Sequence, residues 1–215
     1  MNSTEEKKDE IYVGELKNGQ RHGLGNLKFS KGKEYQGEFK NNTFHGTGQL
    51  KTTIGLSYEG EFQNGAFHGI GQLKQLMEKP DETIFYRGEF KNNEPHGYGK
   101  YAFAKDRFYE GEFKNGVFHG KGTSIHKEIS SYEGEFENGA YHGLGKSIAY
   151  GRFSYQGEFR NGLPEGKGKL IEENGSVYEG EFQNGQYLEI QNFSKPKKTP
   201  DFLKLIKEEK GIKEP

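Results

Sequence analysis

Aromatic and polar residues alternate along short stretches of the chain, and a glycine-rich segment follows each stretch. Between residues 35 and 40, Tyr35, Gly37 and Phe39 alternate with three polar residues. A period of two places one set on each face of a β-strand. An asparagine-containing pair comes next, followed by a second extended segment, His45 to Leu50. The pattern therefore predicts two strands joined by a tight turn, which is a β-hairpin.

This hairpin pattern recurs along most of the chain. Successive copies of Tyr-x-Gly-Glu are 23 residues apart, apart from one interval of 28 residues. The eight copies begin at residues 12, 35, 58, 86, 109, 132, 155 and 178. Positions within each repeat are numbered here from this first tyrosine. We expect a repeat array over residues 12–190, a polar and solvated N-terminal tail over 1–11, and a linker with a C-terminal segment over 191–215.

Glycine and asparagine hold fixed places in the repeat. Position 7 is asparagine in all eight copies, and position 8 is glycine except for Asn42 and Asn93. Because asparagine is the non-glycine residue that best tolerates a positive φ, position 8 is predicted to be a left-handed turn residue. Glycine also occupies positions 3, 12 and 14. We expect these glycines to make room for tyrosine and phenylalanine rings that lie flat across the sheet.

The complete motif, Tyr-x-Gly-Glu-Phe-x-Asn-Gly-x-x-His-Gly-x-Gly, resembles the membrane occupation and recognition nexus (MORN) repeat. The resemblance implies an all-β fold, an elongated single-layer antiparallel sheet of successive hairpins. Local departures are Leu16 at the phenylalanine position, Glu165 at the histidine position, and the loss of glycines after Tyr187. The first and last repeats are expected to act as caps of the array.

Composition limits the classes of function. Apolar residues make up 30% of the 215 residues, which is too few for a deep core, yet 13 tyrosines and 17 phenylalanines argue against disorder. A formal charge of −1 supplies no overall attraction to nucleic acid or anionic lipid. The absence of cysteine excludes disulfides and thiolate metal sites. No cofactor is predicted, and no signal peptide or long apolar run is recognised, so a cytoplasmic location is expected.

Two repeated polar side chains were considered as chemical groups. Histidine occupies position 11 in six repeats, but equivalent residues two strands apart are separated by about 9.6 Å, too far to share one metal ion. Glutamate occupies position 4 in all eight repeats. An array of equivalent carboxylates supplies no acid that differs from its base. Both residues are interpreted as structural, and the chain is predicted not to be an enzyme.

Two segments outside the regular repeat could carry function. An insertion near Gln75–Glu82 is predicted to form a longer loop between the third and fourth repeats, either a tolerated loop or a partner contact. Near residue 200 a short α-helix is predicted, with Phe202, Leu205 and Ile206 on one face. It would either cover the last hairpin or insert into a partner. The lysines just before it, residues 195, 197 and 198, give a weak membrane or tubulin signal.

The sequence therefore favours a non-enzymatic protein–protein interaction scaffold. Its resemblance to MORN proteins with short flanks implies a structural role in a cilium or flagellum axoneme, or in another cytoskeletal assembly. The alternative is a membrane-surface tether that binds phosphoinositides through the repeats. The partner and the oligomeric state stay open. The residues expected to contact a protein partner are Phe39, Phe44, Phe62, Phe67, Phe90, Phe113, Phe118, Phe136, Tyr141, Phe202, Leu205 and Ile206.

Overall fold

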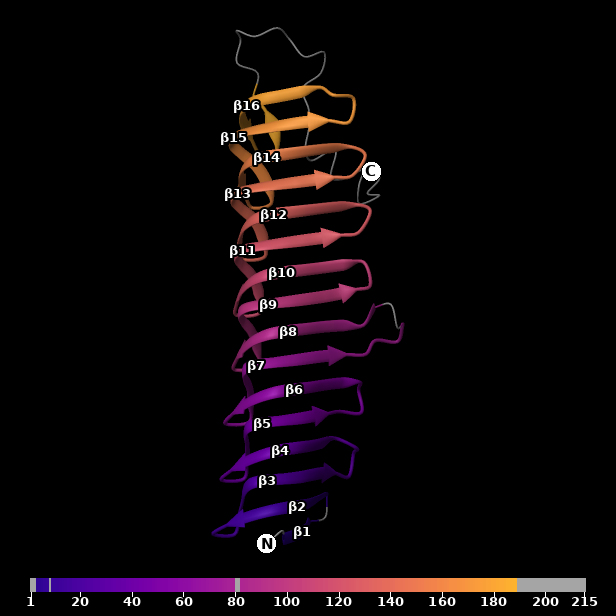
Figure 1. The fold of residues 1–215 in the computed structure, drawn as a ribbon, viewed down its shortest axis with the longest axis vertical. Coiled ribbons are helices and arrows are strands. Elements are labelled where there is room, and N and C mark those ends of the chain that lie inside the picture. The colour runs from indigo at the N-terminus through magenta and orange to yellow at the C-terminus, as the bar shows by residue number, and fades with distance from the viewer. Residues whose placement is uncertain (1–2, 8, 80–81, 189–215) are drawn as a thin grey trace. The chain divides into compact units, whose positions relative to one another are not determined.

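The computed structural model describes residues 3–7, 9–79 and 82–188 (Figure 1). The chain divides into two compact units. The first unit comprises residues up to 105 together with 113–116, and the second comprises 106–112 and the residues from 117 onward. Within the described residues the fold is all-β, with 17 strands and no α-helix. The predicted helix with Phe202, Leu205 and Ile206 lies outside the described residues. In the described part, no helix is long and apolar enough to cross a membrane.

The first unit is an open antiparallel sheet in which each strand pairs with the next one along the chain. Its strands are β1 (Ser3–Lys7), β2 (Glu10–Lys17), β3 (Gln20–Phe29), β4 (Glu34–Lys40), β5 (Thr43–Lys51), β6 (Leu56–Gln63), β7 (Ala66–Gln75), β8 (Ile84–Lys91) and β9 (Glu94–Ala104). The sequence had indicated a solvated tail before residue 12. The structure instead forms β1 there, and β1 gives the edge of β2 a hydrogen-bonded neighbour.

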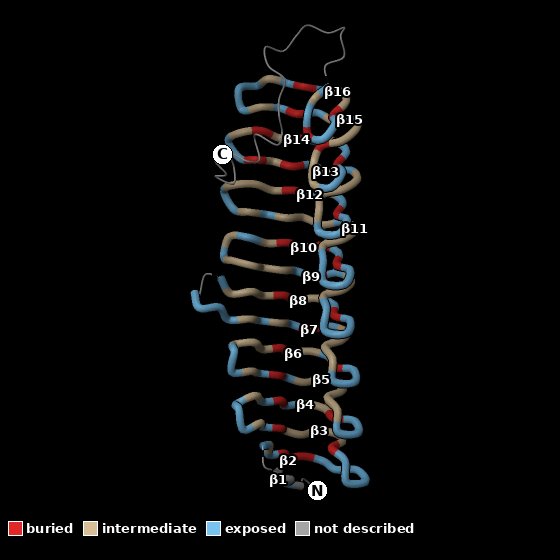
Figure 2. The backbone as a smooth tube through the Cα atoms, turned by 180° about the vertical axis from the view of Figure 1, so that it is seen from behind, coloured by how far each residue is buried: buried red, intermediate tan, exposed pale blue. Residues whose placement is uncertain are grey.

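The second unit repeats the same arrangement. Its strands pair in chain order from β11 onward. They are β11 (Val117–His126), β12 (Ser130–Glu137), β13 (Ala140–Ala149), β14 (Phe153–Arg160), β15 (Leu163–Glu172), β16 (Val177–Gln183) and β17 (Gln186–Tyr187), while β10 (Arg107–Lys114) contains residues of both units. The buried residues recur at corresponding places in successive hairpins of each unit (Figure 2).

Each hairpin turn consists of positions 7 and 8. Asn41 and Asn42 have φ values of 50° and 67°, and Asn93 has a φ of 72°. Two successive residues with positive φ define the type I′ turn, whose twist matches that of paired strands. The predicted left-handed conformation at position 8 is confirmed. The sequence reasoning missed that the asparagine at position 7 is left-handed too, with φ between 49° and 53° in all eight repeats.

Candidate binding surface

The tyrosine at position 1 is the buried centre of each repeat. Its exposed fraction is at most 5% in all eight repeats. The hydroxyl of Tyr35 donates a hydrogen bond to the backbone carbonyl of Glu38 at 2.8 Å, and the first seven repeats share this contact. Burial raises the pKa of Tyr35 far above its usual value, and the nearby Glu38 carboxylate adds to this effect. The position-1 tyrosines therefore serve as packing groups, and in the first seven repeats also as hydrogen-bonding groups.

Glycines at positions 3 and 14 allow each tyrosine ring to lie on the backbone. A Cβ added to Gly37 would lie 2.5 Å from the Cα of Gly48, its cross-strand partner. A Cβ added to Gly48 would lie 2.5 Å from the Tyr35 hydroxyl oxygen. Real atoms do not approach so closely, so any larger residue would displace the ring or the neighbouring strand. The expectation that these two glycines make room for flat rings is confirmed.

The glycine at position 12 has another role, and the expectation of a ring above it was wrong. Gly46 has a φ of 57°, and a Cβ there would overlap the carboxylate of Glu38. That carboxylate accepts a hydrogen bond from the backbone N–H of Thr47 at 2.8 Å, which lowers the pKa of Glu38. Corresponding bonds occur in six repeats. The hydrogen bond to the glutamate at position 4 therefore stabilises the strand pair at the place where its register shifts.

In four repeats the histidine at position 11 lies across the strand pair from the glutamate at position 4. His45 lies directly across from Glu38 in the strand pair. The Nδ1 atoms of His22, His45, His68 and His119 are buried without a hydrogen-bond partner among the described residues. Nowhere in the described part of the chain do three or more histidine, cysteine, aspartate or glutamate side chains gather as a metal site would require. The histidines are spread one per hairpin, as their spacing predicted.

The phenylalanines at position 5, five of which were predicted to contact a partner, are buried in an aromatic ladder. Phe39, Phe62, Phe90, Phe113 and Phe136 have exposed fractions of only 3–4%. The ring of Phe39 packs edge-on against Tyr35 of its own repeat and Tyr12 of the preceding repeat, with centroid distances of 5.1 and 5.2 Å. Such rings stabilise the stack of repeats, but they leave little area for another molecule.

The aromatic residues at position 10 are the more accessible part of the same face. Phe44, Phe67, Phe118 and Tyr141 are half-buried. Each ring stacks on the tyrosine of its own repeat, with centroids 3.7–3.8 Å apart and planes within 10° of parallel. In the first repeat, Arg21 takes this position and lies 5.1 Å from the centroid of the Tyr12 ring. The side of the sheet that carries positions 1, 5, 10 and 16 is called the aromatic face below.

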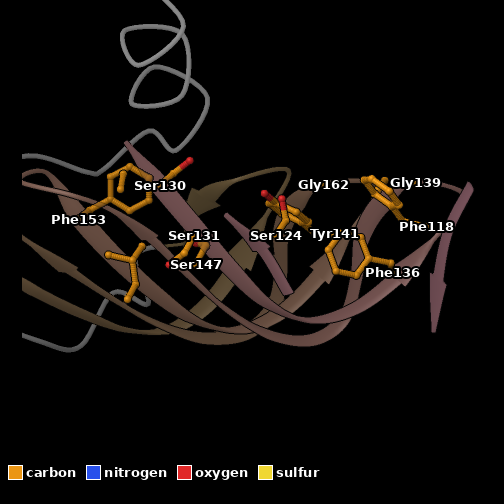
Figure 3. Close-up of a pocket in the computed structure, with 13 residues that line it drawn as sticks. Phe118, Ser124, Ser130, Ser131, Phe136, Gly139, Tyr141, Ser147, Phe153 and Gly162 are labelled. Carbon is orange, nitrogen blue, oxygen red and sulfur yellow. The ribbon is translucent and has the colours of Figure 1, made fainter. Parts of the chain in front are cut away.

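The aromatic face of the second unit contains a hollow of about 350 Å³. Phe118, Phe136 and Tyr141 lie toward one side of the hollow, and Phe153 and Ser130 lie toward the other (Figure 3). Its remaining lining comes from Ser124, Ser131, Gly139, Ala140, Ser147, Ile148, Ala149 and Gly162. The sequence reasoning did not identify these serines. The signal that could have found them is position 16, where Ser124 and Ser147 stand in place of leucine.

The opposite face carries exposed apolar side chains at position 13, which the sequence reasoning also missed. In the first unit, Leu24, Ile70 and Tyr98 have exposed fractions of 63%, 58% and 53%. Leu144 in the second unit is 65% exposed. Polar residues separate this row: Thr47 occupies position 13 between Leu24 and Ile70. The row is therefore interrupted.

Comparison with protein families agrees with this geometry. The MORN repeat model matches residues 12–34, 35–56, 58–74, 86–106, 109–125, 132–148, 155–177 and 178–187, together more than half of the chain. The chain belongs to the MORN repeat family, with eight repeats across residues 12–187. A comparison with curated proteins gives no match.

Proposed function

We propose that this protein is a non-enzymatic scaffold that binds another protein along its aromatic face. The observation that carries the proposal is the pair of half-buried aromatic residues at position 10 in each unit, Phe44 and Phe67 in the first and Phe118 and Tyr141 in the second, each resting on a buried tyrosine. Rigid aromatic side chains that are held in place before binding are typical centres of protein interfaces. The tyrosines under these rings lie directly on the sheet, because glycines such as Gly48 leave room for them against the backbone.

The repeated polar groups support a scaffold rather than an enzyme. The Glu38 carboxylate is held by the N–H of Thr47, and the Tyr35 hydroxyl is held by the carbonyl of Glu38. Each group is thus engaged in closing its own hairpin. Glycosidase-type catalysis requires two carboxylates in different environments, whereas six of the position-4 glutamates accept the same backbone hydrogen bond. Among the family's roles, assembly within an axoneme or another cytoskeletal structure, in the cytoplasm, is the setting that we propose for this chain.

The test compares one residue on each face. Phe118→Ala removes a ring from the aromatic face, and Leu144→Ala removes an exposed apolar side chain from the opposite face. Proteins that co-purify with the chain from cells would be identified and then measured in purified form. We expect Phe118→Ala to weaken association by about 1–3 kcal/mol and Leu144→Ala to change it little. Urea unfolding first establishes that both variants are folded.

Two outcomes would contradict the proposal. If Leu144→Ala abolishes association while Phe118→Ala retains it, the opposite face is the binding surface. If the protein instead sediments with phosphoinositide vesicles at physiological ionic strength and binds no protein, the membrane tether is the correct function. A formal charge of −1 favours weak lipid binding, since each basic residue near an anionic membrane contributes only about 1 kcal/mol.

A further inference from the structure

The hollow on the second unit has a specific origin in two serines. On the aromatic face, Tyr132 lies across from Ser124 on one side and from Ser147 on the other. The equivalent residues in the first unit are Leu27, Leu50, Leu73 and Tyr101, and in the seventh repeat Leu170. Leu27 and Leu170 are exposed by 2% or less, so a leucine at this position fills the space between tyrosines. Serine is smaller, and both Ser124 and Ser147 line the hollow, while Tyr132 itself stays fully buried.

The wall of the hollow includes one serine whose hydroxyl is buried. Ser147 is 7% exposed, and its Oγ is buried without a hydrogen-bond partner among the described residues. Folding gains nothing from this arrangement, because a buried hydroxyl without a partner costs about 1–3 kcal/mol. Leucine at position 16 would be the more stable choice. The serines therefore need an explanation outside the packing of the chain itself.

The lining of the hollow restricts what could enter it. Its side chains are serines, small apolar residues and the rings of Phe118, Phe136, Tyr141 and Phe153, with no charged group among them. A charged side chain would lose its hydration there without gaining an ionic partner. An aliphatic side chain would fill the space but leave the Ser147 hydroxyl unpaired. An aromatic ring with a polar tip would satisfy both requirements, and tyrosine and tryptophan are the side chains of this kind.

We propose that the serine hollow is a specificity pocket of the scaffold, and that it receives one tyrosine or tryptophan side chain from the bound protein. The ring would pack against Tyr141 and Phe153. The Ser147 hydroxyl is buried in the wall of the hollow, so this side chain would turn toward the ring and exchange a hydrogen bond with its polar tip. Aromatic anchors buried in such pockets commonly dominate the affinity of an interface. This inference rests on the proposed function, because it places the pocket on the same aromatic face.

The test uses side-chain analogues as probes, so no partner is needed. The full chain would be titrated with p-cresol, 3-methylindole and toluene, which represent tyrosine, tryptophan and phenylalanine, while backbone amide shifts are followed by NMR. We expect p-cresol and 3-methylindole to shift the amides of residues 124, 130 and 147 saturably. Ser147→Leu should weaken p-cresol binding at least tenfold by filling the hollow. Ser147→Ala should weaken p-cresol about two- to tenfold, the value of one hydrogen bond, and leave toluene unchanged.

A matched control and three outcomes keep the test decisive. Thr123→Leu enlarges the neighbouring residue of β11, which lies outside the lining of the hollow, and it should leave probe binding unchanged. If p-cresol binds the parent chain and Ser147→Leu equally well, the hollow is not its binding site. If p-cresol causes no saturable shift, the hollow is not a binding pocket. If p-cresol binds only to the double variant Phe202→Asp and Leu205→Asp, the chain's own C-terminal segment occupies the hollow, and the proposed occupant is wrong. Each of these results could occur while Phe118→Ala still weakens the binding of a protein partner. Failure of the pocket can therefore be distinguished from failure of the scaffold.

Discussion

The two units of this chain use the same tyrosines and glycines but differ in what lies between the tyrosines. In the first unit, leucines such as Leu27 and Leu50 fill the spaces, with exposed fractions of 2% and 7%. In the second unit, Ser124 and Ser147 take the same position and line a hollow, whereas Leu170 fills this position in the seventh repeat. The difference shows that one position of a repeat can be changed without altering its turns or its strand register. A repeat array can thus keep one fold while its surface varies locally.

The largest expected effect is a loss of stability at alkaline pH, caused by the buried tyrosines that both units share. Burial raises the pKa of Tyr35, Tyr58, Tyr86, Tyr132 and Tyr155, which belong to both units. Below the usual tyrosine pKa of about 10, the folded and unfolded chains are both protonated, and these tyrosines cause no pH dependence. Above it, the unfolded chain loses protons that the folded chain keeps. The free energy of unfolding should therefore fall as pH rises, by up to about 1.4 kcal/mol per pH unit for each tyrosine.

This alkaline effect is measured by urea unfolding, followed by circular dichroism, at several pH values from neutral to strongly alkaline. Tyrosinate absorbance at each pH serves as the control, since lysines titrate in the same range. In the folded chain it should stay well below the value for the unfolded chain. Full ionisation of the tyrosines in the native chain, with no loss of stability, would show that the rings are not shielded from water.

The next prediction places in the first unit the serine that two repeats of the second unit carry at position 16. Leu50 lies between Tyr35 and Tyr58 in the paired strands. Leu50→Ser should lower the free energy of unfolding by about 3–5 kcal/mol, through lost burial, a new cavity and an unpaired hydroxyl. Leu50→Met keeps the volume and should cost less than about 1.5 kcal/mol. Urea unfolding compares the two variants. If Leu50→Ser lowers the free energy of unfolding less than Leu50→Met does, filling position 16 is unimportant for stability.

The smallest effect asks whether the turns of the two units are equivalent. Gly116 and Gly139 have φ values of 79° and 82°, and neither has an atom within 4 Å of an added Cβ. Valine at either position meets no clash, so its cost comes from the left-handed backbone alone, about 1 kcal/mol or more. We expect nearly equal costs for Gly116→Val and Gly139→Val in denaturant unfolding. Clearly different costs would show that the two turns are under different strain, and no cost would contradict the turn conformation.

Much of the fold could be predicted from the sequence, because the repeat encodes it locally. The period-two pattern gave the strands, and the glycine–asparagine exchange at Asn42 gave the turn. The role of Gly46 could not be obtained this way, since it depends on where the Glu38 carboxylate lies after the strands pair. The pairing of β1 was missed because its polar residues carry no apolar alternation.

The binding surface was harder to predict than the fold. Sequence reasoning placed phenylalanines such as Phe39 on one face, but only the packing reveals that tyrosines of two repeats bury each of these rings. The hollow escaped detection because a serine at one repeat position draws no attention in a chain rich in polar residues. Its importance depends on the leucines that fill the same position elsewhere, such as Leu170.

Pairing of each strand with the next one along the chain also determines how either unit would respond to mechanical force. Hydrogen bonds of a hairpin whose two ends are pulled apart break one after another, as in a zipper, and not all at once. A unit stretched from its ends should therefore open hairpin by hairpin at modest force. Each opened repeat of 23 residues would release about 75 Å of chain. Such a protein would extend in steps and recover the same way, because every hairpin carries its own turn and its own buried tyrosine.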